Sequence, residues 1–285
     1  MKSKCNPLLY ITSVTFICIC LSCGNNPVNE RVSEKKETKK ESVETDISQN
    51  APAYVLKPNG DTSLNIYLTF DDGPFKTTSD LSKLLTEKNI KTSFFIIGSQ
   101  VDRSSYYDSV FHSVAENPLF KIFNHSYTHA ITGGKYTKYY QNPESVWNDI
   151  QKNKTHLPPN SYITRLPGTS TWRIKDFKVG SDKVSKKMMR YLDSVQSNEH
   201  LIGWNYSWKP WHSKDSMTVK EMITEVMNKR NSRYAPFKNN TVILLHDYLF
   251  PNKTSLDNLS LFIDELQLKY GCTFRWISEY PGVLN

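Results

Sequence analysis

The sequence predicts one α/β domain folded as a closed or nearly closed β/α barrel. Short apolar runs, rich in β-branched and aromatic residues, alternate about six times with amphipathic stretches of helical spacing. The chain of 285 residues is 38% hydrophobic, enough to bury the core of one sizeable domain. Such alternation implies parallel strands covered by helices, and this many repeats favours a barrel over an open sheet.

The elements follow one another at regular intervals. The expected strands are NIYLTF (65–70), TSFFIIG (92–98), LFKIFN (119–124), YITRL (162–166), HLIGWN (200–205), TVILLH (241–246) and TFRWI (273–277). The expected helices begin at Ser79, Ser105, Pro143, Val184, Val219 and Leu256. In such a barrel the working residues lie at the carboxyl ends of the strands, so polar residues after these runs are the candidates for a site.

The first 50 residues differ in composition from the rest of the chain. Two lysines precede an apolar run over 7–21 that is too short to span a bilayer but has the length of a signal-peptide core. Residues 1–23 are therefore expected to be a signal peptide, and the protein to be exported. Residues 24–50 have no aromatic side chains and mixed charge, so we expect a disordered tether ahead of a folded domain over 51–285.

The cysteines extend this expectation. The signal ends in CLSCG, which resembles a bacterial lipoprotein box with Cys23 as the lipidated residue. Cys20 stands where such boxes prefer leucine, so a simple signal peptide and an uncleaved anchor remain alternatives. Lipid on Cys23 would anchor the domain to a membrane of the bacterial cell envelope. Cys272 is the one thiol left in the folded part, which excludes a disulfide there, and we expect it in a buried strand.

Charge and motifs exclude several classes of protein. The net charge of +8 suits an anionic polymer, although a solvated, lysine-rich surface explains it equally well. The sequence contains no Gly-x-Ser-x-Gly elbow, no phosphate-binding Gly-x-x-x-x-Gly-Lys-Ser/Thr loop, no Gly-x-Gly-x-x-Gly and no His-Glu-x-x-His. Serine hydrolases, nucleotide-binding proteins and zincins are thereby excluded, and we expect no nucleic-acid partner.

A candidate metal site comes from two strand ends. In YLTFDDGP the adjacent carboxylates of Asp71 and Asp72 repel each other unless a cation lies beside them. In NHSYTH, His125 and His129 have i, i+4 spacing, which a helical turn would place on one face, as two ligands of one metal require. One carboxylate and two imidazoles leave coordination positions open for water and substrate. One aspartate would then bind the metal and its neighbour work beside it, but charge alone does not assign the two roles.

Four motifs together resemble a known family. TFDDGP, NHSYTH, RLPG and LLHD, in this order and at these intervals, are similar to the successive motifs of the polysaccharide deacetylases, the NodB-homology domain of carbohydrate esterase family 4. The resemblance extends from about Ile66 to the C-terminus. It implies a distorted β/α barrel that removes N-acetyl groups, and sometimes O-acetyl groups, from sugars. It also implies one divalent metal, zinc before cobalt or nickel.

The resemblance assigns roles to the residues of the first two motifs. It makes Asp71 the general base and Asp72 a metal ligand together with His125 and His129. Arg165 resembles the arginine that pairs with the base and fixes its orientation. An amide nitrogen is a poor leaving group and has to be protonated as its bond breaks, so a second titrating group is required.

The remaining motifs supply the acid and the pocket. His246 resembles the catalytic acid, and Leu244 the leucine that lines the pocket for the acetyl methyl. The third motif is shortened to Arg165-Leu166-Pro167-Gly168, with Pro167 and Gly168 as substrate-binding residues and the backbone N–H of Gly168 or Thr169 as the oxyanion donor.

The fourth motif departs from the family. GWNYSWKPW has Asn205 and Ser207 where acids are expected beside His246. Asn205 could still form a hydrogen bond to His246 but would not favour the imidazolium, so we expect a lower pH optimum or weakened activity. The tryptophans of this region are candidates for stacking on sugar rings in an open groove, with barrel packing as the alternative for each. They are Trp172, Trp204, Trp208 and Trp211.

The sequence therefore predicts an exported, monomeric, metal-dependent hydrolase. Its expected reaction is removal of N-acetyl groups from an amino-sugar polysaccharide such as peptidoglycan, a chitin-like polymer or a surface glycan. Two alternatives remain open. One is an O-acetyl esterase on xylan or another acetylated glycan, and the other is a non-catalytic glycan-binding protein that keeps the metal for structure.

Overall fold

The computed structural model describes residues 64–130, 136–180, 182–209, 216–231 and 236–283. The chain divides into two units, Met1–Ala53 and Tyr54–Asn285, and all described residues belong to the second. The predicted signal peptide, Cys23 and the tether lie outside the described residues. None of the described helices is both long enough and apolar enough to cross a membrane.

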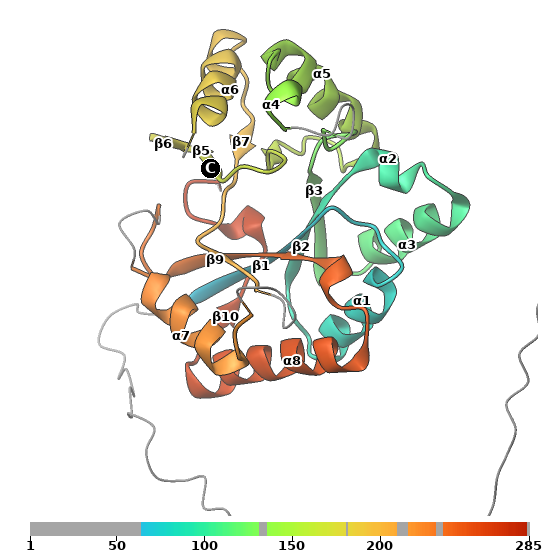
Figure 1. Ribbon diagram of the computed structural model, residues 1–285, viewed down its shortest axis with the longest axis vertical. Helices are drawn as coiled ribbons and strands as arrows, with labels where there is room; N and C mark the ends of the chain where they lie inside the picture. Colours follow the sequence, from blue (N-terminus) through green and yellow to red (C-terminus); the bar gives the residue numbers. More distant parts are fainter. Residues whose placement is uncertain (1–63, 131–135, 181, 210–215, 232–235, 284–285) are drawn as a thin grey trace, which may run out of the picture. The chain divides into compact units, whose positions relative to one another are not determined.

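The second unit alternates strands with helices (Figure 1). Its strands are β1 (Asn65–Asp71), β2 (Thr92–Ile96), β3 (Phe120–Asn124), β4 (Ile163–Thr164), β5 (Thr171–Ile174), β6 (Phe177–Gly180), β7 (His200–Leu201), β8 (Tyr206–Ser207), β9 (Asn240–His246) and β10 (Thr273–Phe274). Its α-helices are α1 (Thr78–Glu87), α2 (Gly98–Val101), α3 (Ser105–Ala115), α4 (Tyr136–Tyr139), α5 (Pro143–Asn153), α6 (Lys183–Ser194), α7 (Val219–Lys229) and α8 (Lys253–Asp264). Every predicted strand and helix is present.

The sheet is largely parallel and curved. Its strand order is β6-β5-β7-β4-β3-β2-β1-β9-β8, with β10 paired to the side of β1. All ladders are parallel except the two that β5 makes with β6 and β7. Among the described residues no ladder joins β6 to β8, so the barrel is open between its two end strands. The predicted distorted β/α barrel is confirmed.

The alternation of side chains along β1 creates two cores. Ile66, Leu68 and Phe70 point outward into the core between sheet and helices. Tyr67 points to the other face, into the core inside the barrel. Because side chains on a strand alternate with a period of two, Asp71 shares the inner face with Tyr67. The polar end of β1 is therefore directed into the barrel.

Strand β9 repeats this arrangement beside β1. Ile243 and Leu245 belong to the outer core, so Leu244 and His246 lie on the inner face. The parallel register pairs Asp71 with His246. Two candidate catalytic residues thus leave neighbouring strands at the same level.

The structure adds elements that the apolar runs did not predict. Strands β5 and β6 form an antiparallel hairpin whose turn holds Lys175 at a left-handed φ of 42°. Its exposed charged residues obscure the apolar pattern of a strand. Helix α8 begins three residues before the expected start at Leu256, because Asn252 and Ser255 form a capping box. Cys272 is buried with a free thiol, as expected, but it directly precedes β10 instead of lying within it.

Candidate active site

The site begins where β1 ends. Asp72 follows the last strand residue with a φ of 72°, a left-handed conformation that Asp tolerates better than most residues. Gly73 comes next, and a Cβ on it would lie 2.5 Å from Oδ2 of Asp247, so the close approach requires glycine. This sharp turn explains why two neighbouring carboxylates point to different partners.

The predicted helical turn for the histidine motif is wrong. Ser126 and His129 have φ values of 66° and 51°, so the segment is an irregular loop. It folds back because the His129 N–H donates to Ser126 Oγ at 3.1 Å and the Thr128 N–H and hydroxyl both donate to Asp149 Oδ2. The two imidazoles still meet, with ring centroids 4.9 Å apart.

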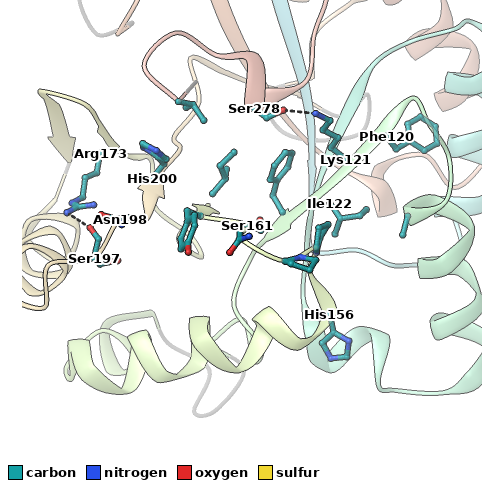
Figure 2. Close-up of a pocket in the computed structure, with 18 of the residues that line it drawn as sticks. Phe120, Lys121, Ile122, His156, Ser161, Arg173, Ser197, Asn198, His200 and Ser278 are labelled. Atoms are coloured by element: carbon teal, nitrogen blue, oxygen red, sulfur yellow. Dashed lines mark hydrogen bonds between the residues drawn. The ribbon is translucent and has the colours of Figure 1, made fainter. Parts of the chain in front are cut away.

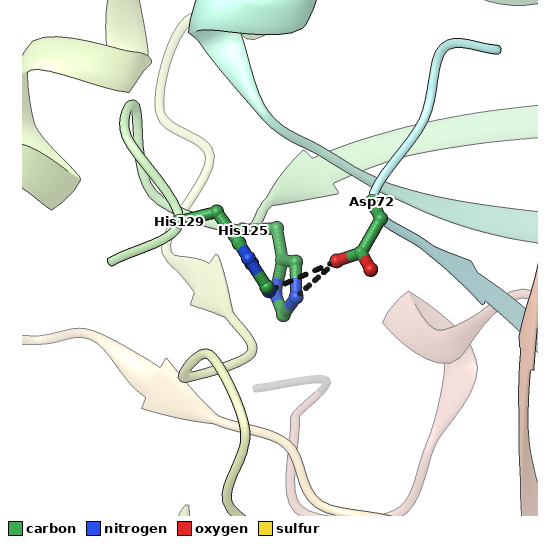
Figure 3. Close-up of side chains that lie close together, drawn as sticks. All are labelled: Asp72, His125 and His129. Atoms are coloured by element: carbon green, nitrogen blue, oxygen red, sulfur yellow. Dashed lines mark ion pairs between the residues drawn. The ribbon is translucent and has the colours of Figure 1, made fainter. Parts of the chain in front are cut away.

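Asp72, His125 and His129 converge on one point (Figure 3). Nε2 of His125 and Nε2 of His129 lie 3.2 and 3.0 Å from Oδ1 of Asp72, and the three ligand atoms lie within 4.8 Å of one another. Burial disfavours ionisation of Asp72, but its contacts with the two histidines outweigh this and hold its pKa well below the usual range.

The donor set fits a divalent metal. Asp72 Oδ1 is buried and accepts no hydrogen bond of good geometry within the described structure, so its lone pairs are free for an ion. His125 Nδ1 lies 2.9 Å from the carbonyl oxygen of Arg165, which only accepts. Nδ1 therefore carries the proton, and Nε2 presents its lone pair to the centre of the triad.

Arg165 holds Asp71 at the edge of this triad. Its Nη1 donates to Asp71 Oδ1 and to Thr69 Oγ1, each at 2.7 Å. Oδ2 of Asp71 lies 3.7 Å from His125 Nε2, so one carboxylate oxygen binds the arginine and the other faces the candidate metal site. Burial lowers the pKa of Arg165, and the attraction of Asp71 offsets only part of this.

His246 lies near Oδ2 of Asp72, the carboxylate oxygen that does not face His125 and His129. Its Nε2 is 3.7 Å from Asp72 Oδ2, and burial lowers its pKa despite the nearby carboxylates. The hydrogen bond that Asn205 could form to His246 is absent from the described structure, and Asn205 Oδ1 instead accepts the backbone N–H of Val242 at 2.7 Å. Ser207 is exposed on β8. In the described part of the chain, no acid or amide orients His246.

The shortened third motif lies next to the triad. Gly168 has a φ of 68°, and a Cβ there would lie 2.6 Å from the ring of Tyr136, so this position requires glycine. The carbonyl of Pro167 accepts the hydroxyl of Tyr140 at 2.7 Å, which fixes the turn. The Thr169 N–H donates a hydrogen bond to the carbonyl oxygen of Leu166 at 3.4 Å. The Gly168 N–H has no acceptor among the described residues.

The comparisons with known proteins agree with the motifs. A family model for polysaccharide deacetylase matches residues 59–165. A peptidoglycan-N-acetylglucosamine deacetylase from Bacillus cereus is 32% identical over 216 residues, which are 73% of this chain and 67% of that protein. The chain belongs to the polysaccharide deacetylase family. The family predicted from the four motifs is confirmed.

Other relatives of this family member are more distant or much longer. A bifunctional xylanase/deacetylase from Pseudobutyrivibrio xylanivorans is 26% identical over 219 residues, which are 75% of this chain but only 30% of that protein. The catalytic domain of a peptidoglycan N-acetylglucosamine deacetylase from Eubacterium rectale has the same fold, with a TM-score of 0.55 and 23% identity over 80% of this chain and 95% of that one. A CE4 esterase from Streptococcus mutans gives a TM-score of 0.55 at 19% identity, over 76% of this chain and 86% of that one.

Two of the tryptophans expected to stack on sugars are core residues in this deacetylase-family chain. Trp172 is 3% exposed and packs 5.3 Å from the ring of Tyr280, and Trp208 is 7% exposed against Phe250 and Phe262. A sugar-binding role does not fit either of them, because packing of the barrel uses both rings. Trp204 is half-buried, with its ring 5.8 Å from the Arg165 guanidinium, and Trp211 lies outside the described residues.

Two tyrosines that the sequence analysis missed flank the triad instead. Tyr136 is 45% exposed with its ring 5.9 Å from that of His129, and Tyr248 is 45% exposed with its ring 5.1 Å from that of His246. Burial and the charge of Asp72 raise the pKa of both phenols. The position of Tyr248, two residues after a strand-end histidine, was a usable signal, whereas Tyr136 lies in a polar stretch that gave none.

Proposed function

We propose that this chain is a metal-dependent hydrolase that removes N-acetyl groups from an amino-sugar polysaccharide of the bacterial envelope, with peptidoglycan as the first substrate to test. The observation that carries the proposal is the position of Asp71, held by Arg165 on one side and open to the metal triad on the other. The B. cereus relative, named as a peptidoglycan-N-acetylglucosamine deacetylase, supports the choice of substrate.

The metal would be held by Asp72, His125 and His129. Two imidazole nitrogens and one carboxylate oxygen suit zinc, and cobalt and nickel accept the same donors. A divalent ion bound there supplies Lewis-acid chemistry, which polarises a carbonyl and makes water more acidic. The remaining steps fall to side chains of this chain.

Asp71 serves as the general base. Its Oδ2 faces the triad, where it takes the proton of the attacking water, while the Arg165 guanidinium donates to Oδ1 and fixes the orientation of the carboxylate. The backbone N–H of Gly168 is the donor we assign to the developing oxyanion, because it has no acceptor in the described structure.

His246 serves as the acid that protonates the leaving nitrogen. It ends β9 opposite Asp71 in register, so acid and base flank the triad from adjacent strands. Leu244 lies two residues earlier on the same inner face and provides an apolar wall for the acetyl methyl. Trp204, Tyr136 and Tyr248 present aromatic surface for the sugar rings, with Pro167 and Gly168 at the floor.

An O-acetyl esterase is the second candidate function. It is favoured by the absence of a hydrogen-bond partner for the His246 ring in the described structure, because an alkoxide leaves more readily than an amide nitrogen and needs less help from an acid. One relative, a bifunctional xylanase/deacetylase, combines acetyl removal with a xylan-degrading activity. A non-catalytic glycan-binding role has no such observation in its favour.

We further propose that residues 1–23 direct export and that lipid on Cys23 anchors the domain to the envelope, with the catalytic domain acting as a monomer. Labelling with a radioactive fatty acid tests the anchor. Label should be incorporated into the full chain and be lost in Cys23→Ala, while Cys272→Ala keeps it. Label that persists in Cys23→Ala would overturn the anchor without touching the proposed activity.

Replacement of Asp71 by Asn tests the proposed activity. With zinc, cobalt or nickel added, the chain from Gly24 onward should release acetate from chitooligosaccharides and peptidoglycan. Asp71→Asn should lower this by about 10²–10⁴-fold, the usual range for loss of a general base, while keeping one equivalent of metal. Asp108→Asn, which changes an exposed carboxylate on α3, is the matched control.

The outcomes separate the candidates. Acetate from acetylated xylan but not from chitooligosaccharides would select the esterase. Undiminished release by Asp71→Asn would remove Asp71 as the base. Bound metal without acetate from any of these substrates would leave the glycan-binding alternative.

A further inference from the structure

A cavity lies at the end of the barrel where the parallel strands begin, away from the candidate active site. It has a volume of about 1100 Å³ and is lined where β3, β4 and β7 begin, at Phe120, Ile163 and His200. The catalytic candidates lie where β1 and β9 end. Because β3, β4 and β7 run parallel to β1 in the sheet, the cavity opens on the face opposite the metal triad.

Several separate segments line this cavity (Figure 2). They are β3, α3, the segment 156–162 that leads into β4, the β5–β6 hairpin, the segment 197–200 and the C-terminal segment with Ser278 and Val283. The floor is apolar, with Phe123, Ile163 and Val283 all buried. Small-molecule sites are typically clefts of about 300–1,000 Å³, so this cavity has room for a ligand of at least that size.

The charged side chains of the lining are all basic. Lys121 comes from β3, whereas Arg173, Lys175 and Lys178 come from the β5–β6 hairpin, and no Asp or Glu is among the residues that line the cavity. Asp193 lies outside the lining and accepts from both Arg173 and Lys178, so that corner keeps one net positive charge.

The other two lysines have no carboxylate partner among the described residues. The Lys121 ammonium donates to Ser278 Oγ at 3.2 Å (Figure 2). It also lies 4.4 Å from the centre of the Trp276 ring. Lys175 forms no ion pair within the described part of the chain. These ammonium groups have the charge and freedom to bind an incoming anion.

Three histidines of the lining add little charge. His112 pairs with Asp108 at 3.5 Å and His156 with Asp102 at 3.2 Å, so acids outside the lining already engage them. Burial, together with the charge of Arg173, lowers the pKa of His200, which leaves that imidazole neutral. The positive charge of the cavity therefore comes from its lysines and arginine.

The lining also carries polar and aromatic side chains of the types that can bind sugars. Tyr162 is 43% exposed at the cavity, which offers ring surface for the C–H face of a pyranose. Asn160, Ser161 and Asn198 add two amides and one hydroxyl to the lining, as donors and acceptors for sugar hydroxyls.

We propose that this cavity binds an acidic glycan, a short stretch of sugar units that carry carboxylates, independently of the metal triad. The lysines pair with the carboxylates, Tyr162 stacks on a ring, and the amides and hydroxyls bind the sugar hydroxyls. A deacetylase holding an acidic polymer on one face would present its catalytic rim to acetylated chains on the other. The basic side chains of this cavity account for part of the net charge of +8.

Binding of labelled trigalacturonate to the zinc-loaded chain from Gly24 onward tests the proposal. Lys121→Gln/Lys175→Gln should weaken binding by about tenfold or more, as expected for loss of two charge-assisted contacts. The matched control is Lys83→Gln/Lys253→Gln, which removes the same charge. Its two side chains are 76% and 87% exposed and lie on α1 and α8, away from the cavity. Tyr162→Ser should also weaken binding, whereas Tyr106→Ser, at an equally exposed tyrosine of α3, should not.

Each outcome supports or overturns the site. Equal losses in the two lysine pairs would reduce the effect to nonspecific charge. If neutral maltotriose binds as tightly as trigalacturonate, the lysines have no role in recognition. If triglutamate binds more tightly than trigalacturonate and Tyr162→Ser does not weaken its binding, the cavity is a site for acidic peptides. Displacement of the probe by excess chitotriose would place it at the catalytic rim. Acetate release from a short soluble substrate should be the same in Lys121→Gln/Lys175→Gln as in the unchanged chain, so failure of this site leaves the proposed function standing.

Discussion

At the scale of single residues, Arg165 fixes the geometry of Asp71. The guanidinium is fully buried. Besides its hydrogen bonds to Asp71 and Thr69, it donates from Nε to the Ile202 carbonyl at 3.1 Å and from Nη2 to the Gly203 carbonyl at 3.0 Å. These carbonyls belong to the segment after β7, so the arginine joins that segment to the end of β1. A buried charge held this way is costly to leave without its partner.

Arg165→Met should therefore destabilise the fold by about 3–5 kcal/mol, because it leaves Asp71 as a buried acid without a counter-charge. The double variant Asp71→Asn/Arg165→Met should regain part of this loss, since the neutral amide needs no cation. Urea unfolding of the set gives the coupling free energy between the two positions. Strictly additive losses would show that the pair is not coupled.

At the scale of elements, helix α5 sets the conformation of the histidine loop. Oδ2 of Asp149 accepts from the Thr128 N–H at 3.2 Å, from the Thr128 hydroxyl at 3.0 Å and from the Tyr139 hydroxyl at 2.8 Å. Its backbone carbonyl accepts the N–H of Tyr127 at 3.2 Å. One residue of α5 thus fastens the loop on which His129 depends for its left-handed conformation.

Asp149→Ala should lower the affinity of the chain for zinc by about 10–100-fold, the usual cost of losing a group that orients a ligand. Titration against a competing chelator measures this directly, without reference to activity. Asp149→Asn keeps one acceptor oxygen and should lose less, while Glu144→Ala, on the exposed side of α5, should change nothing. Unchanged zinc affinity in Asp149→Ala would show that the loop holds its shape unaided.

The same contacts mark the limit of prediction from the sequence. Strands and helices were predictable because their periods repeat along a short window, and the positions of Asp71 and His246 were predictable because each ends a strand. The His125–His129 loop was not, because its shape depends on Asp149, which lies in another element. Asn205 was a possible hydrogen-bond partner of His246, but its Oδ1 accepts the backbone N–H of Val242 on β9.

At the scale of the whole molecule, Asp247 connects three segments of the fold. It follows β9, and its fully buried Oδ2 accepts the hydroxyl of Thr78 at the start of α1 and lies against Gly73 after β1. Its other oxygen, Oδ1, has no hydrogen-bond partner in the described structure. Burial raises the pKa of Asp247 to about 7, and the Thr78 hydrogen bond offsets only part of this effect.

A raised carboxyl pKa makes the folded state more stable in acid. Between the unfolded value, 3.8, and about 7, the unfolded chain has released this proton while the folded chain retains it. The contribution of Asp247 to the free energy of unfolding is therefore complete below about pH 4 and is lost as the pH rises to about 7. A shift of about three pKa units corresponds to roughly 4 kcal/mol across that window.

Asp247→Asn removes this titration and should flatten the pH dependence of stability. Urea unfolding of the metal-free chain should be measured at several values between pH 4 and pH 8. The free energy of unfolding of the variant should rise relative to that of the unchanged protein as the pH rises, since the amide has no charge to bury. Asp72 acts in the opposite direction, because its pKa is lowered in the folded state and its contribution is lost in acid. That contribution is present in both proteins, so the difference between them reports Asp247 together with its repulsion by Asp72. A difference that does not change with pH would mean that Asp247 ionises in the fold as readily as in the unfolded chain, and that the link between β9, α1 and the turn at Gly73 is held by a carboxylate instead of a neutral acid.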